Sequence, residues 1–355
     1  MKTAPSAIAP ATALWRAMPP TRLLDCGMDY ADVLQLQRLT ADVPWDVAAE
    51  SLGTAQLDRA AAADAAGHSA TAIEAYRFAA ANFLFAQMAY NFDGPRKVAL
   101  YGRFTAAVGG AGKRSDPAWQ RVEIPFAGGR MFGWLIRPTA DPVGTVILLG
   151  GQSGWGAAYL AQADALTARG LAVLLAEGPG QGDTRMVGGV YLDVDVAAAY
   201  SAFVNVTVDC TPAVGIWGNS LGGLYAAVTA ARDPRIVAVC VNGAPAQPKL
   251  LGFRAFGEQA AAMLGTTDPD AIQANFDRIA LRPGRDRIGG ALMVLHGGND
   301  PLIGLVEQQP FLDAATDATL RIWDDGEHTI YNHAAERTAL VADWFADHLA
   351  NRART

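Results

Sequence analysis

A serine framed by glycines carries the clearest sign of chemistry in this sequence. Residues Gly218–Gly222 read Gly-Asn-Ser-Leu-Gly, which fits the G-x-S-x-G pattern of a nucleophile elbow. The apolar run Val214–Trp217 precedes the pattern, and a segment of helical character follows from Leu224. A strand, a tight turn and a helix in this order expose a serine hydroxyl at the edge of a sheet. We therefore expect Ser220 to be a nucleophile that needs a neighbouring base to take its proton.

Two further residues follow Ser220 in the order that such chemistry needs. Asp300 comes after the apolar run Ala291–Leu295, in a loop at the expected carboxyl end of a strand. His328 lies in the turn after Leu320–Trp323, which alternates like a final strand. An imidazole titrates near neutrality and can act as base and then as acid, and a carboxylate holds its tautomer. Serine, aspartate, histidine is the chain order of the α/β-hydrolase triad, so we predict a triad of Ser220, Asp300 and His328.

Other residues compete for these roles. His296 and His333 are alternatives to His328 as the base, but His296 is expected to end a strand and His333 to lie inside a last helix over Tyr331–Asn351. Ser153 is a poor alternative nucleophile, because no G-x-S-x-G frame surrounds it. Three acids near the histidine are alternatives to Asp300, namely Asp324, Asp325 and Glu327.

A glycine pair marks the place expected for an oxyanion hole. Thr145–Leu149 reads as a central strand and runs into Gly150–Gly154, the position from which α/β-hydrolases supply one N–H to the developing oxyanion. The second N–H belongs to the residue after the nucleophile. We therefore assign the donors to the backbone N–H groups of Gln152 and Leu221, each contributing about 3 kcal/mol to stabilisation of an alkoxide.

Two glycine clusters resemble nucleotide-binding loops without completing them. Gly178–Asp183 follows the strand-like Leu171–Ala176 but has Asp183 where a dinucleotide fingerprint has its third glycine. Gly109–Arg114 resembles half a P-loop, with Arg114 in place of the serine or threonine and no strand before it. The cysteines also lack the spacing of a zinc site. We therefore expect neither a cofactor nor a metal.

Length and composition agree with an enzyme that acts on a small molecule. The chain has 355 residues, is 51% apolar and carries a formal charge of -7. It has no basic patch, so nucleic acid is not an expected partner. The three cysteines are scattered and odd in number, which favours a reduced, cytoplasmic protein. No signal peptide and no apolar run of membrane-spanning length is evident, so a membrane is not expected as a partner either.

The hydrophobic pattern divides the chain near residue 118. Residues 1–20 read as a loose tail, 21–118 as a helical domain and 119–355 as a catalytic domain in which strands alternate with helices. This alternation predicts an eight-stranded, mostly parallel sheet, with a helical cap inserted at about 250–285. In the helical domain, the expected helices are Ala31–Leu39, Trp45–Ala66, a long helix from Ser69 and Pro95–Val108. A linker over Gly109–Pro117 is expected to follow them.

Several stretches resemble a known family. The chain resembles the 2,6-dihydroxypseudooxynicotine hydrolase-like α/β-hydrolases in three segments, Leu24–Tyr30, Val122–Phe126 and Glu177–Gly182. This family is related to the fermentation-respiration switch esterases and to fungal hydrolases that shorten polyketides. The resemblance implies an α/β-hydrolase fold, an N-terminal helical domain that covers the triad and substrate, and frequent homodimers. The sequence departs from the family at Gln152–Ala158, where acidic residues are common, and at Asn242–Pro245, which offers no carboxylate.

Together these features predict a serine hydrolase that cleaves a C–C bond next to a ketone, in a β-diketone or polyketide-like substrate, through an acyl-enzyme. The same triad would serve an esterase, a thioesterase, or an acyltransferase or cyclase acting on a secondary metabolite, so these alternatives stay open. A catalytically inactive binding protein is the remaining alternative.

Overall fold

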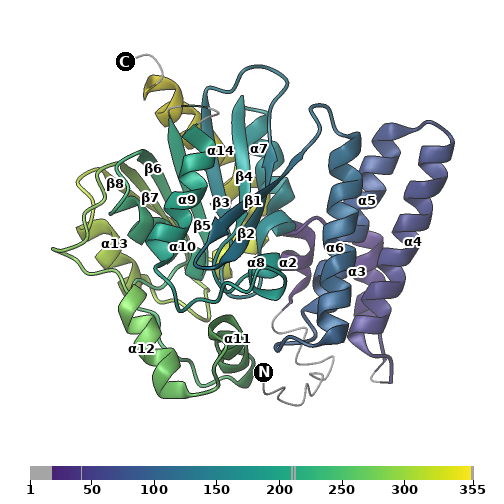
Figure 1. The fold of residues 1–355 in the computed structure, drawn as a ribbon, viewed down its shortest axis with the longest axis horizontal. Helices are drawn as coiled ribbons and strands as arrows, with labels where there is room; N and C mark the ends of the chain where they lie inside the picture. The colour runs from purple at the N-terminus through teal and green to yellow at the C-terminus, as the bar shows by residue number, and fades with distance from the viewer. Residues whose placement is uncertain (1–17, 41, 209–210, 212, 353–355) are drawn as a thin grey trace. The chain divides into compact units, whose positions relative to one another are not determined.

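The computed structural model describes residues 18–352 except 41, 209, 210 and 212, and the chain forms two compact units (Figure 1). The first unit spans residues 1–120 and the second spans residues 121–355. Residues 1–17, which make up most of the expected N-terminal tail, lie outside the described residues. Among the helices that are described, none is both long enough and apolar enough to cross a membrane.

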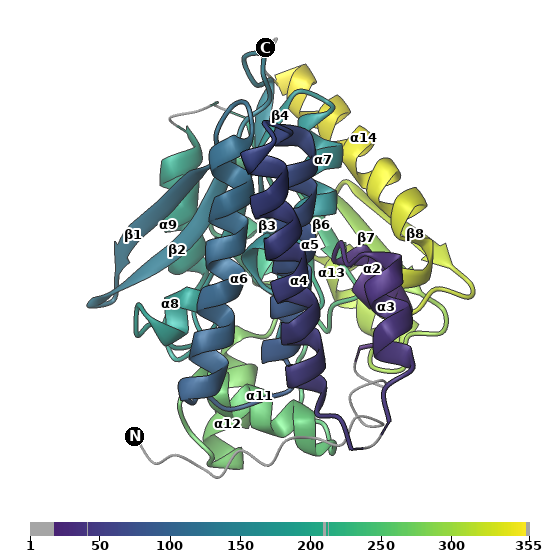
Figure 2. The ribbon, with the colours of Figure 1, turned by 90° about the vertical axis from the view of Figure 1, so that its right-hand side faces the viewer.

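The first unit consists of helices, three of which are long. Figure 2 shows these three, α4, α5 and α6, packed side by side. The second half of α5 is buried at every residue from 79 to 87, because α5 contacts both of the other long helices. The helices are α2 (Pro20–Asp25), α3 (Tyr30–Gln37), α4 (Trp45–Ala65), α5 (Ser69–Gln87) and α6 (Pro95–Arg114).

The expected linker over Gly109–Pro117 is wrong, because α6 continues to Arg114. Its glycines allow a close approach between helices: a Cβ on Gly110 would lie 2.6 Å from the ring of Tyr76 in α5. Arg114 also forms an ion pair with Asp64 of α4. Glycine has a low helix propensity, but packing against a neighbouring helix outweighs that preference here.

Two glycines of α6 give a matched test of this packing. We expect Gly110→Ala to lower the free energy of unfolding by about 1–3 kcal/mol, because the new methyl group would overlap the Tyr76 ring. A Cβ on the exposed Gly102 would meet no heavy atom within 4 Å. We therefore expect Gly102→Ala to raise the free energy of unfolding by about 0.5–1 kcal/mol through helix propensity. Urea denaturation measures both, and shifts of the same sign would contradict the packing argument.

The second unit is built on one sheet of eight strands. Their order is β1-β2-β4-β3-β5-β6-β7-β8. The strands from β3 to β8 pair in parallel, whereas β2 pairs antiparallel with β4. The expected eight-stranded, mostly parallel α/β-hydrolase sheet is therefore confirmed. The strands are β1 (Gln120–Phe126), β2 (Gly129–Ile136), β3 (Gly144–Leu149), β4 (Leu171–Glu177), β5 (Val214–Asn219), β6 (Ile236–Asn242), β7 (Ala291–Gly297) and β8 (Ala318–Trp323).

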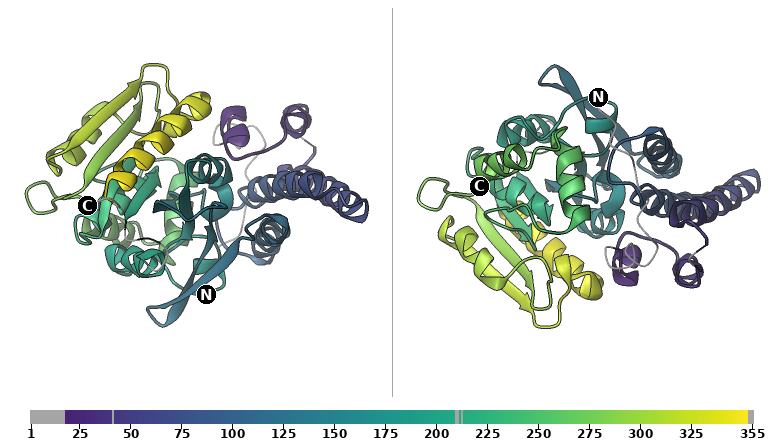
Figure 3. Two further views of the ribbon diagram at one scale, coloured as in Figure 1. Left: turned by 90° about the horizontal axis from the view of Figure 1, so that it is seen from above. Right: turned by 90° about the horizontal axis from the view of Figure 1, so that it is seen from below.

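Helices cover both faces of this sheet, because its central strands are apolar on both sides. β3, β4 and β5 are buried at every residue. α9 packs beside α10 and α7 packs beside α14, with α9 on one side of the strands and α7 and α14 on the other in Figure 2. The views from above and below in Figure 3 show helices on both sides of the sheet. The helices and 3-10 turns are η1 (Gly156–Tyr159), α7 (Leu160–Thr167), α8 (Gly182–Met186), α9 (Val196–Val208), α10 (Leu221–Ala230), η2 (Leu305–Gln308), α13 (Gln309–Asp313), η3 (His328–His333) and α14 (Ala334–Arg352).

Two helices interrupt the alternation between β6 and β7, as the expected cap requires. They are α11 (Arg254–Leu264) and α12 (Pro269–Ile279). The rings of Phe256 and Phe276 meet edge to face between them, with centroids 6.5 Å apart. The side chain of Gln152 donates from Nε2 to the carbonyl of Phe256 at 2.7 Å. The cap is thus joined to the loop after β3, where the oxyanion hole is expected.

Candidate active site

Ser220 lies between β5 and α10 in a backbone conformation that few residues adopt. Its φ is 55° and its ψ is −136°, a strained region that costs about 1–3 kcal/mol. The turn is so sharp that a Cβ on Gly218 would lie 2.0 Å from the carbonyl oxygen of Gly222. A Cβ on Gly222 would in turn lie 2.5 Å from the carbonyl oxygen of Gly150. The glycines of the motif are therefore required by the close approach of backbone segments.

The side chains of the three predicted triad residues form one chain of hydrogen bonds. His328 Nε2 lies 3.0 Å from Ser220 Oγ, and His328 Nδ1 lies 2.8 Å from Asp300 Oδ2. The other oxygen of this buried carboxylate, Oδ1, accepts from the backbone N–H groups of Leu302 at 2.8 Å and Ile303 at 3.2 Å. With its proton on Nδ1 beside the carboxylate, a neutral imidazole presents a lone pair to the serine hydroxyl.

The turn that carries His328 is fixed by buried polar groups. Thr329 and Ile330 have φ values of 52° and 64°, in the left-handed region that such residues seldom occupy. The carbonyl of Thr329 accepts from Nη1 of the buried Arg337 at 2.9 Å and from Nδ2 of Asn242 at 3.1 Å. These two donors stabilise the strained turn and thereby the position of the imidazole.

The loop after β3 lies directly against the elbow. A Cβ on Gly151 would lie 2.8 Å from Ser220 Cβ and 3.0 Å from the backbone nitrogen of Leu221. Within the described part of the chain, neither the backbone N–H of Gln152 nor that of Leu221 donates a hydrogen bond. Both residues line the same pocket as Ser220. Two N–H groups beside a nucleophile, both free to bind an oxygen, are what an oxyanion hole requires.

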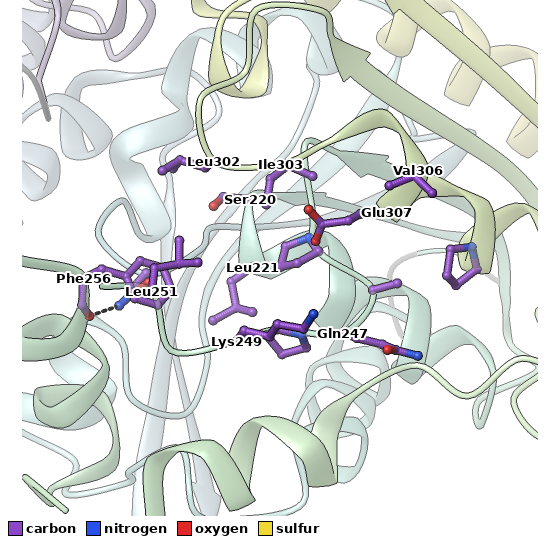
Figure 4. Close-up of a pocket in the computed structure, with 15 residues that line it drawn as sticks. Ser220, Leu221, Gln247, Lys249, Leu251, Phe256, Leu302, Ile303, Val306 and Glu307 are labelled. Atoms are coloured by element: carbon purple, nitrogen blue, oxygen red, sulfur yellow. Dashed lines mark hydrogen bonds between the residues drawn. The ribbon is translucent and has the colours of Figure 1, made fainter. Parts of the chain in front are cut away.

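A pocket of about 470 Å³ opens beside Ser220 (Figure 4). This volume suits a small organic molecule. The loops after β3, β6 and β7 supply most of its wall. The polar lining residues are Gln152, Ser220, Gln247, Lys249 and Glu307. The others are apolar: Leu221, Pro245, Ala246, Pro248, Leu251, Phe256, Leu302, Ile303, Val306 and Pro310.

The competing bases and nucleophile are placed elsewhere. Both ring nitrogens of His328 face Ser220 and Asp300, which leaves neither for Ser153. His296 is buried at the end of β7, as expected, and burial lowers its pKa. His333 lies in η3 rather than inside the last helix, which begins at residue 334 and not at 331 as expected. The left-handed backbone after His328 delays the start of that helix.

The competing acids lie in the turn between β8 and η3. Asp325 Oδ1 pairs with His333 Nε2 at 2.8 Å, so two of the competing residues contact each other on the surface. Asp324 is also exposed, and Glu327 is half-buried. The carboxylate beside His328 Nδ1 is that of Asp300.

Sequence reasoning missed the buried groups that support the site. Arg337 lies near the start of α14 between Glu336 and Thr338, and an arginine in such a polar stretch gives no sign that it is buried against the histidine turn. Gln181 lies in the glycine cluster after β4, and it hydrogen-bonds to the loop after β3. The sequence gives one indication of this contact, the glycine content of the cluster, because glycines allow a backbone to approach a neighbouring segment closely.

The arrangement of strands, elbow and histidine turn can be compared with known proteins. Residues 161–352 match the prolyl oligopeptidase family. This chain belongs to that family. It is therefore a hydrolase of the α/β-hydrolase type, and the match includes the elbow, Asp300 and His328.

Individual proteins extend the likeness beyond the matched region. The 2,6-dihydropseudooxynicotine hydrolase of Paenarthrobacter nicotinovorans is 25% identical over 345 residues, which are 92% of this chain and 90% of the relative. The crystal structure of the 2,6-dihydroxy-pseudo-oxynicotine hydrolase matches with a TM-score of 0.82 at 23% identity, covering 94% of this chain and 96% of the other. A structure of wild-type AbyA5 matches with a TM-score of 0.71 at 18% identity, covering 95% and 98%. The resemblance expected from the sequence is thus confirmed along nearly the whole chain of this prolyl oligopeptidase family member.

Proposed function

We propose that Ser220, His328 and Asp300 act as nucleophile, general base and orienting carboxylate of a serine hydrolase. The observation that carries the proposal is the unbroken chain of hydrogen bonds from Ser220 Oγ through both nitrogens of His328 to Asp300, beside a pocket of substrate size. The backbone N–H groups of Gln152 and Leu221 stabilise the oxyanion that forms when the serine attacks.

The proposed substrate is a β-diketone or a polyketide-like ketone. Ser220 Oγ attacks one carbonyl carbon while His328 Nε2 takes the hydroxyl proton. The C–C bond to the carbon between the two carbonyls then breaks, its electron pair leaves as an enolate, and His328 returns the proton to that carbon. A water molecule, deprotonated by His328, attacks the acyl-enzyme and releases Ser220. One water is consumed, and one carboxylic acid and one ketone are formed.

A C–C bond breaks in a hydrolase only when the departing carbanion is stabilised, and a second carbonyl group provides that stabilisation as an enolate. Two features of this chain, its resemblance to known hydrolases and the wall of its pocket, support cleavage of such a bond. The resemblance to hydrolases that shorten polyketides favours this chemistry, because shortening a carbon chain requires a C–C bond to break. The mostly apolar wall of the pocket suits a ketone with an apolar body.

Product analysis with a simple diketone tests the proposal. We expect benzoylacetone in water enriched with heavy oxygen to give a carboxylic acid and a ketone in equal amounts, with one heavy oxygen atom in the acid and none in the ketone. An ester and a thioester of the same acyl group serve as comparisons. If only these are hydrolysed, the protein is an esterase or thioesterase. If the acyl group passes to an added alcohol in preference to water, it is an acyltransferase, and in either case the C–C proposal is wrong.

A further inference from the structure

The glycine-rich turn after β4 carries a glutamine that no nucleotide-binding role explains. Gln181 is fully buried. The glycines around it let the backbone approach its neighbours closely: a Cβ on Gly178 would lie 2.2 Å from the hydroxyl of Tyr200, and Gly180 has a φ of 79°. The turn is therefore shaped to place one polar side chain inside the protein.

Every hydrogen-bonding position of the Gln181 side chain is used. Nε2 donates to the carbonyl oxygens of Gly150 at 2.7 Å and Gly151 at 3.0 Å. Oε1 accepts from the backbone N–H of Gly178 at 3.0 Å and from the hydroxyl of Tyr200 at 3.3 Å. Carbonyl oxygens can only accept and a backbone N–H can only donate, so this environment fixes which way the amide points.

The two carbonyls belong to the loop that carries the expected oxyanion donor. The carbonyl of Gly151 and the N–H of Gln152 are parts of one peptide group, and the two point in opposite directions when the peptide is trans. Within the described residues, the peptide bond before Pro117 is the only cis one. A donor that binds the carbonyl of Gly151 from one side therefore turns the N–H of Gln152 to the opposite side, and Gln152 lines the pocket that contains Ser220.

We propose that Gln181 is the positioning residue of the oxyanion hole. By binding both carbonyls of the Gly150–Gly151 pair, its amide fixes the direction in which the Gln152 N–H points. Glycines have no side chain to restrain the backbone, so without this amide the loop would sample orientations in which the N–H misses the oxyanion. The inference rests on the proposed function, because it assigns a reason for the alignment of one of the two donors.

The first test replaces Gln181 with methionine, which is similar in length but has no N–H. Complete loss of one oxyanion donor lowers kcat by about 10²–10³-fold, so we expect a misaligned donor in Gln181→Met to lower kcat for p-nitrophenyl acetate by about 10–100-fold. KM should change by less than about threefold, because the oxyanion forms only in the transition state. Affinity for phenylboronic acid, whose adduct with Ser220 imitates that state, should fall by a factor similar to kcat.

Gln308→Met is the matched control. Gln308 is as fully buried as Gln181, and its Nε2 also donates to a backbone carbonyl, that of Ala244 at 3.0 Å. We expect the control to lose thermal stability while keeping its affinity for phenylboronic acid. An equal loss of boronate affinity in both variants, or wild-type kcat and boronate affinity in Gln181→Met, would overturn the inference. Ser220→Ala distinguishes failure of the positioning role from failure of the proposed function. If Ser220→Ala is inactive while Gln181→Met behaves like the wild type, the proposed function stands and only the positioning role is wrong.

A second variant covers the case in which Gln181→Met does not fold. Glutamate has the shape of glutamine, but its ionised carboxylate cannot donate to two carbonyl oxygens, whereas its protonated form can donate to one. We expect kcat of Gln181→Glu, relative to wild type at each pH, to rise as the pH falls. A ratio that is independent of pH from about 5 to 10, a range that includes the titration of a buried glutamate, would contradict the positioning role.

Discussion

Replacing Ser220 with alanine is expected to lower kcat by about 10⁵–10⁶-fold for esters and diketones alike. The alanine has no oxygen to form the acyl-enzyme, while His328, Asp300 and the two N–H groups remain in place. The protein should stay folded, because the Ser220 hydroxyl makes its hydrogen bond only to His328 among the described residues. Initial rates, together with circular dichroism of the variant, measure both parts of this prediction.

A covalent probe identifies the nucleophile independently of any substrate. A fluorophosphonate should label the wild type at Ser220, which peptide mass spectrometry locates, and should not label Ser220→Ala. Ser153→Ala is the control, since Ser153 lies in the loop after β3 and has no free nitrogen of His328 to activate it. Labelling of another serine, or appreciable turnover by Ser220→Ala, would show that the nucleophile has been misassigned.

The fold and the triad could be predicted because they depend on local patterns. Apolar runs such as Thr145–Leu149 are buried at every residue in a central strand and leave a continuous signal in the sequence. A parallel sheet brings the carboxyl ends of its strands to one edge, so residues that follow different strands meet there. Ser220, Asp300 and His328 follow β5, β7 and β8, and their meeting is a consequence of this topology.

What could not be predicted depends on contacts between segments that are distant in the sequence. Gly110 looks like part of a flexible linker until Tyr76 is seen to occupy the space beside it. The carbonyl of Thr329 in the histidine turn accepts from Asn242, which lies 87 residues earlier at the end of β6. Gln181 is a similar case, because it lies in a pattern that fails as a dinucleotide fingerprint, while its amide donates to two carbonyls of the loop after β3. In each case the glycine or the buried polar residue was visible, but its partner was not.

Two expectations from the sequence concern the role of the helical unit and the oligomeric state. The role of residues 21–118 in covering the substrate stays a prediction, as does the formation of a homodimer. Among the residues that the structure describes, those that line the pocket all belong to the second unit. An ester as small as p-nitrophenyl acetate therefore suits the tests of the triad and the oxyanion hole, because its hydrolysis does not depend on either expectation.

The choice of carboxylate has the second largest expected effect. Asp300→Asn should lower kcat by about 10⁴-fold, and the hydrogen bonds of Asp300 explain why the loss should be so large. Oδ1 accepts from two backbone N–H groups, those of Leu302 and Ile303, so the amide oxygen of an asparagine would take that place. Its NH₂ group would then face His328 Nδ1, which would have to accept that hydrogen bond and move its own proton to Nε2. An imidazole in this tautomer cannot take the proton of Ser220.

The competing acids supply the controls for this prediction. Asp324→Asn should change kcat by less than about threefold, because its exposed side chain is not the one beside His328 Nδ1. Asp325→Asn should have a similarly small effect, since Asp325 pairs with His333 on the surface. Steady-state kinetics of the three variants decide the question. If Asp325→Asn were as damaging as Asp300→Asn, the surface pair would be needed to hold the histidine turn, and the hydrogen bond from Asp300 to His328 could no longer be taken as the sole source of the imidazole's orientation.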